Sequence, residues 1–71
     1  MEIKQTQKFH KWFSKLDNVT SAIVFARLIV VSRGSLGLWR SVGKGVCELK
    51  MDHGPGYRVY FTFRDGELIL L

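Results

Sequence analysis

The sequence predicts an α+β protein in which an antiparallel sheet carries two helices on one face, in the order β-α-α-β-β-β-β. Three observations predict this class. Apolar residues recur at helical spacing in the first half of the chain, and they alternate with polar residues in the second half. Gly-Pro-Gly and Asp-Gly turn signals separate the alternating segments. Because 71 residues supply one small core, residues 1–71 are expected to form a single domain.

The first elements follow from capping and periodicity. Glu2–Gln5 is a short strand candidate, and Thr6 is placed to cap a helix by accepting a free N–H of its first turn. Four large apolar side chains then form one helical stripe, which is typical of a core-facing helix: Phe9, Trp12, Phe13 and Leu16. Asp17-Asn18 is predicted to end this helix.

A second helix is expected to begin with Thr20 or Ser21 as its cap, run to about Ser32 and end at Gly34. The segment Ala22–Val31 has almost no polar face, so one apolar side is predicted to meet another molecule. Two alternatives stay open. Both sides could be covered within the domain, or the β-branched content could indicate a buried strand.

The second half of the chain is predicted to form a loop and four strands. Gly43-Lys44-Gly45 joins the second strand to the third, and Asp65-Gly66 is the two-residue connection of a type I′ hairpin. The expected loop is Gly34-Ser35-Leu36-Gly37, and the expected strands are Leu38–Val42, Val46–Asp52, Tyr57–Arg64 and Glu67–Leu71.

Alternation assigns the side chains of the two central strands to opposite faces. The core face is predicted to hold Cys47, Leu49, Met51, Tyr57, Val59, Phe61 and Phe63. The outward face is predicted to hold Glu48, Lys50, Asp52, Arg58, Tyr60, Thr62 and Arg64. One face therefore suits a core, and the other is cationic and includes an aromatic ring.

Composition favours a polyanionic partner. Eleven Lys and Arg against six Asp and Glu give a net charge of +5. A single cysteine, Cys47, forms no internal disulfide, which suggests a reducing compartment and hence a cytoplasmic location. No signal peptide is expected from Met1–Thr6, and Ala22–Val31 has about half the length of a membrane span. We therefore expect no membrane association.

The candidate site is the cationic face, because guanidinium groups bind phosphate and an aromatic ring stacks on a base. The predicted RNA-binding residues are Arg40, Lys44, Lys50, Arg58, Tyr60 and Arg64. The alternative is an ordinary solvated charge cluster. His53, beside the Gly-Pro-Gly turn, is a further catalytic candidate. The two histidines and one cysteine have no metal-ligand spacing, so neither a metal nor another cofactor is expected.

Three stretches together carry a family resemblance: Phe9…Trp12…Leu16, Gly43–Leu49 and the string Gly54-Pro55-Gly56-Tyr57-Arg58-Val59-Tyr60-Phe61. Over the entire chain the sequence resembles the addiction-module killer proteins, HigB/RelE-type toxins of the RelE/ParE superfamily. The resemblance implies a bacterial type II toxin–antitoxin module. Its RelE-like toxins cut messenger RNA, usually on the ribosome, and are neutralised by a cognate antitoxin, here expected to be a helix-turn-helix protein.

The resemblance also implies roles for particular residues. Arg58 is the arginine of the Gly-Tyr-Arg motif that faces the scissile phosphate, and Lys44 or Lys50 would support it. Relatives continue past the last strand with a segment that carries further catalytic side chains, and this chain is expected to lack that segment after Leu71. Two alternatives therefore remain. The chain could be a shortened toxin that only binds antitoxin or RNA, or a ParE-type gyrase inhibitor.

Overall fold

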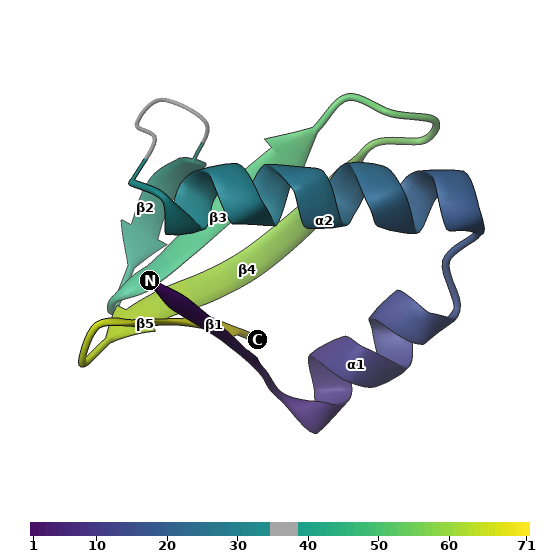
Figure 1. Ribbon diagram of the computed structural model, residues 1–71. Helices are drawn as coiled ribbons and strands as arrows, with labels where there is room; N and C mark the ends of the chain where they lie inside the picture. Colours follow the sequence, from purple (N-terminus) through teal and green to yellow (C-terminus); the bar gives the residue numbers. More distant parts are fainter. Residues whose placement is uncertain (35–38) are drawn as a thin grey trace.

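Two helices and a five-stranded sheet make up the structure, a computed structural model that describes residues 1–34 and 39–71 (Figure 1). The predicted element order is confirmed. The elements are β1 (Glu2–Gln5), α1 (Gln7–Ser14), α2 (Asn18–Ser32), β2 (Trp39–Gly43), β3 (Val46–Met51), β4 (Tyr57–Arg64) and β5 (Glu67–Leu70). The expected loop from Ser35 to Gly37 and the expected strand start at Leu38 lie outside the described residues.

The sheet is mixed rather than wholly antiparallel, which corrects the expectation from the sequence. Its strand order is β1-β5-β4-β3-β2, and β1 runs parallel to β5. The other neighbouring pairs are antiparallel. Alternation within a strand shows which side chains share a face, but it does not show the direction of the neighbouring strand. The two ends of the chain therefore lie side by side, with Thr6 N donating to Leu70 O at 3.1 Å.

Each helix begins at a side-chain cap. Thr6 Oγ1 accepts from Phe9 N at 3.1 Å, as predicted. The cap of α2 is Asp17, whose carboxylate accepts from Thr20 N at 3.2 Å, so the prediction of Thr20 or Ser21 was wrong. The hydrogen bonds from Thr20 lower the pKa of this carboxyl below its ordinary value. Asp17 thus separates the two helices and also starts the second.

The core lies between the sheet and the helices, both of which cover the same face (Figure 1). Phe61, Leu49 and Met51 are almost completely buried there, which confirms the predicted phase of β3 and β4. Phe63 has the same phase, but 38% of its surface is exposed, so the expectation that it packs beneath the helices was wrong. It packs instead against Trp39, with ring centroids 5.3 Å apart, near the end of β4.

The β4–β5 turn has the geometry predicted from the sequence. Asp65 and Gly66 both have positive φ values, 50° and 77°, as a type I′ turn requires. Arg64 pairs directly with Glu67 across the turn. The prediction of a two-residue hairpin here is confirmed.

The solvent-facing side of α2 carries several large apolar residues, as the sequence predicted, beside the exposed Arg27. Val19, Phe25 and Val30 are 63%, 52% and 39% exposed. Within residues 1–34 and 39–71, α2 is the longer helix, and neither helix is long and apolar enough to cross a membrane.

Candidate nucleic-acid interface

The outer face of the sheet, opposite the helices, gathers the candidate residues by strand register. Arg40 of β2 pairs with Glu48 of β3, and Glu48 pairs with Tyr60 of β4. Two residues further along these strands, Lys50 pairs with Arg58. Because paired residues on neighbouring strands point to the same face, these side chains form one group, here called the outer-face cluster: Arg40, Glu48, Lys50, Arg58 and Tyr60.

Glu48 is the buried centre of this cluster. Its side chain is only 7% exposed, although its phase points away from the core. Oε1 lies 3.4 Å from both Nε and Nη2 of Arg40, and Oε2 lies 3.7 Å from Nη1 of Arg58. The sequence placed Glu48 outward beside Arg58, with an ion pair between them as an alternative role for Arg58, but it did not indicate that Glu48 would be buried or that Arg40 would join Arg58 in covering it.

The cations of the cluster remain accessible to a ligand. The side chains of Arg40 and Arg58 are 73% and 56% exposed, and Tyr60 is 41% exposed. With Lys50, which is also exposed, three cations face one carboxylate. The excess positive charge beside an accessible aromatic ring suits a phosphodiester and a stacked base.

Two predicted RNA-binding residues lie away from this cluster. Lys44 lies in the turn between β2 and β3, and Arg64 is the last residue of β4. Lys44 is four residues from both Arg40 and Glu48, and Arg64 is four residues from Tyr60, which corresponds to about 13 Å along a strand. The structure therefore places both residues on the other end of the β3–β4 pair.

The cationic region ends toward β1 and β5. There Lys4 lies 3.6 Å from carboxylate oxygens of both Glu2 and Glu67. These charges offset one another at the surface. On the outer face of the sheet, the excess of positive charge thus lies on β2, β3 and β4. The helix layer carries a separate set of cations, Lys8, Lys11, Lys15, Arg27 and Arg33.

His53 is not brought into the outer-face cluster. Its Nε2 lies 3.3 Å from Thr20 Oγ1 on α2, and its ring stacks near Tyr57 with centroids 6.4 Å apart. Tyr57 in turn contacts Trp12 of α1. His53 therefore joins the Gly-Pro-Gly loop to the helix layer, on the opposite side of the sheet from Arg58.

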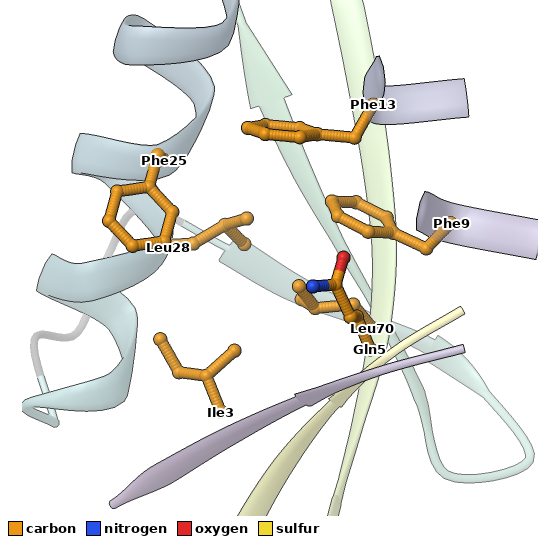
Figure 2. Close-up of a pocket in the computed structure, with 7 residues that line it drawn as sticks. All are labelled: Ile3, Gln5, Phe9, Phe13, Phe25, Leu28 and Leu70. Atoms are coloured by element: carbon orange, nitrogen blue, oxygen red, sulfur yellow. The ribbon is translucent and has the colours of Figure 1, made fainter. Parts of the chain in front are cut away.

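A separate apolar pocket of about 230 Å³ lies between the helices and the β1–β5 end of the sheet. Figure 2 shows Phe25 and Leu28 of α2 facing Phe9 and Phe13 of α1 across it. Among the described residues, its lining is Ile3, Gln5, Phe9, Phe13, Phe25, Leu28 and Leu70. With one amide and no charged group in the lining, the pocket suits an apolar side chain and not a phosphate.

No group of three or more His, Cys, Asp or Glu side chains is placed to hold a metal ion among residues 1–34 and 39–71. Burial raises the pKa of the Cys47 thiol, which disfavours the thiolate form. What this part of the chain offers chemically is charge and stacking on the outer face.

The fold and this face define a small α+β protein with a cationic, aromatic-bearing sheet surface. The chain belongs to the same family as an uncharacterized protein of Haemophilus influenzae. The two are 40% identical over 72 residues, a match that covers 100% of this chain and 73% of the relative. No family model and no solved structure matches the sequence.

Proposed function

We propose that the protein is the toxin of a type II toxin–antitoxin module, with a RelE/ParE-like fold and an outer sheet face that binds messenger RNA and cuts it without a metal ion. The observation that carries the proposal is the position of Arg58. This arginine of the Gly-Tyr-Arg motif is exposed on the outer face of the sheet. It pairs in register with Lys50 and forms an ion pair with Glu48. Tyr60 and Arg40 lie beside it on the same face.

The cluster fits what metal-independent RNA cleavage requires. The ribose 2′-OH loses its proton to solvent and attacks the adjacent phosphorus, and the bond from phosphorus to the 5′-oxygen breaks as that oxygen takes up a proton from solvent. Negative charge builds on the phosphoryl oxygens during this step, and Arg58 and Arg40 are placed to stabilise it. Tyr60 offers a stacking surface for a base, and Lys50 adds a further cation.

An antitoxin is the protein partner that this proposal requires. The exposed apolar side of α2, with Val19, Phe25 and Val30, supports such a partner, as does the adjacent apolar pocket. This surface lies on the helix side of the sheet, away from Arg58. An antitoxin bound there would act without occupying the RNA face, and a cytoplasmic location follows from a messenger RNA target.

The test compares Arg58→Ala with Arg64→Ala, a change of the same kind on the same strand but outside the cluster. RNA affinity is measured at several salt concentrations, together with growth arrest on expression in cells. Arg58→Ala should weaken binding about tenfold, which corresponds to about 1.4 kcal/mol. It should also reduce the salt slope by about 0.7, the value for one phosphate contact on single-stranded RNA.

Stability serves as the control for this test. Arg58 is more than half exposed, but its loss leaves Oε2 of the buried Glu48 carboxylate without its partner, so the free energy of unfolding should fall by about 1–3 kcal/mol. Binding is therefore measured well below the melting temperature of the variant. If Arg58→Ala leaves RNA affinity and salt slope unchanged, the phosphate role is wrong and Arg58 serves only the ion pair with Glu48.

Two further outcomes identify the alternative functions. RNA binding without cleavage, with the predicted response to Arg58→Ala, would indicate a shortened toxin that acts as a binding module. No RNA binding, together with inhibition of purified gyrase, would indicate a ParE-type inhibitor. Both branches of the superfamily share the fold, so these assays decide between them.

A further inference from the structure

Glu48 is the one charged side chain that is buried among residues 1–34 and 39–71. A buried carboxylate is unfavourable unless cations or hydrogen-bond donors satisfy it. Here its two oxygens are divided between two arginines, with Oε1 facing Arg40 and Oε2 facing Arg58. Each arginine comes from a different neighbour of β3, so one carboxylate links three strands.

The division of the carboxylate fixes where the two guanidinium groups lie. β2 and β4 flank β3, so their backbones are about 10 Å apart. Two like charges on long, flexible side chains would otherwise repel each other and separate. Glu48 draws both toward one point above β3. Both side chains remain mostly exposed, so further N–H donors of each guanidinium are left for a ligand.

We propose that Glu48 is a positioning residue that holds Arg40 and Arg58 as a two-armed clamp for one RNA phosphate. This inference rests on the proposed function, since the ligand is the phosphodiester of the bound RNA. Glu48 itself does not touch the phosphate, because it lies buried between the arginines. The three side chains together carry one net positive charge, which matches the single negative charge of a phosphodiester.

A clamp and a simple charge excess predict different results. If the two arginines act independently, the fold-loss of affinity in the double variant should equal the product of the two single fold-losses. If they act as a clamp, either single change should remove most of the joint contribution, so the double change adds little. Glu48→Asp keeps the charge but shortens the side chain by one methylene, so it should no longer reach both arginines.

The experiment is a double-mutant cycle with Arg40→Ala and Arg58→Ala, made in the native chain and again together with Glu48→Asp. The probe is a short single-stranded RNA with 2′-O-methyl groups, which cannot be cleaved. In the native chain each single change and the double change should all weaken binding about tenfold. In the Glu48→Asp background each single arginine change should weaken binding less than in the native chain. The double change should weaken it by the product of the two single losses.

A second measurement tests the positioning without RNA. The Nε–Hε signals of the arginines are recorded by NMR for the native chain, Glu48→Asp and Glu48→Gln. The signals of Arg40 and Arg58 should shift in both variants, while that of Arg64 should not, because Arg64 lies about 20 Å along β4 from Arg58. If Glu48→Gln fails to fold, Glu48→Asp carries this comparison.

The failures of the two proposals are distinguishable. If the probe does not bind, or Arg58→Ala has no effect on its binding, the proposed function fails and the clamp fails with it. If Arg58→Ala weakens binding, but the double variant of the native chain loses affinity by the product of the two single losses, only the clamp is overturned. A cycle unchanged by Glu48→Asp, with a lowered melting temperature, would assign Glu48 a purely structural role and would also overturn the clamp.

Discussion

The two faces of the sheet use one strand for different purposes, and adjacent residues of β4 show the difference. Phe61 is completely buried beneath the helices, whereas Tyr60 is 41% exposed on the open face. One phase of the strand therefore contributes to stability, and the other presents charge and an aromatic ring. The comparison implies that neighbouring substitutions can separate folding from binding in this protein.

Phase alone does not decide exposure on either face. Glu48 belongs to the open face but is buried, because Arg40 and Arg58 cover it. Phe63 belongs to the covered face but is 38% exposed, because it lies near the end of β4. The lateral neighbours of a residue therefore matter as much as its phase.

The largest expected effect is on stability and separates the two faces directly. Phe61→Ala should lower the free energy of unfolding by about 3–5 kcal/mol, because it removes a buried aromatic ring from the core. This is a large part of the total stability expected of a small domain. Tyr60→Ala, one residue away on the open face, should cost about 1 kcal/mol or less. Urea denaturation of both variants provides the measurement, and similar losses would contradict the assignment of faces.

The next effect concerns the outer side of α2. Its exposed apolar residues predict self-association of the isolated chain, reversed when an antitoxin binds. Phe25→Ser should weaken self-association about tenfold in sedimentation equilibrium, with little change in melting temperature. Val42→Ser is the matched control, since Val42 is 45% exposed but lies on β2. A native chain that stays monomeric at the highest attainable concentration would rule this contact out.

A smaller effect is expected from the cap of α2. The folded-state pKa of Asp17 lies below its ordinary value, so the ionised cap stabilises the fold above the unfolded-state pKa, which is about 3.9. That contribution is lost as the pH falls through the lowered folded-state pKa. Asp17→Asn keeps an oxygen acceptor but does not titrate. Thermal melts of both proteins from neutral pH to about pH 2 should show a steeper acid loss for the native chain.

Much of this fold follows from local sequence signals. The β4 segment Tyr57–Arg64 and the type I′ turn were predicted correctly, because alternation and turn residues act over a few positions. The parallel direction of β1 beside β5 was missed, because alternation within a strand does not encode the direction of its neighbour. The cap at Asp17 was missed because a helix-ending residue can also begin the next helix.

For the candidate site, the sequence likewise predicted which side chains share a face, but not how they pack against one another. The outward phase of Lys50, Arg58 and Tyr60 followed from alternation, and the register brings them together. The burial of Glu48 did not follow, because it depends on how long side chains from two other strands fold over it. The position of His53 against Thr20 depends on loop and helix packing, which alternation does not describe.

The smallest expected effect tests whether the open face acts as a whole or only through the outer-face cluster. Lys50 and Lys44 are both exposed lysines of the β2–β3 hairpin, but only Lys50 lies beside Arg58. Lys50→Gln should weaken RNA binding severalfold, because it removes a cation next to the proposed phosphate. Lys44→Gln should weaken it less than about twofold, since exposed charges more than about 10 Å away are largely screened at physiological salt. Both variants should keep the free energy of unfolding within about 0.5 kcal/mol of the native value. Equal losses from the two lysines would show that the RNA follows the whole length of β3 and contacts the hairpin turn as well as the cluster.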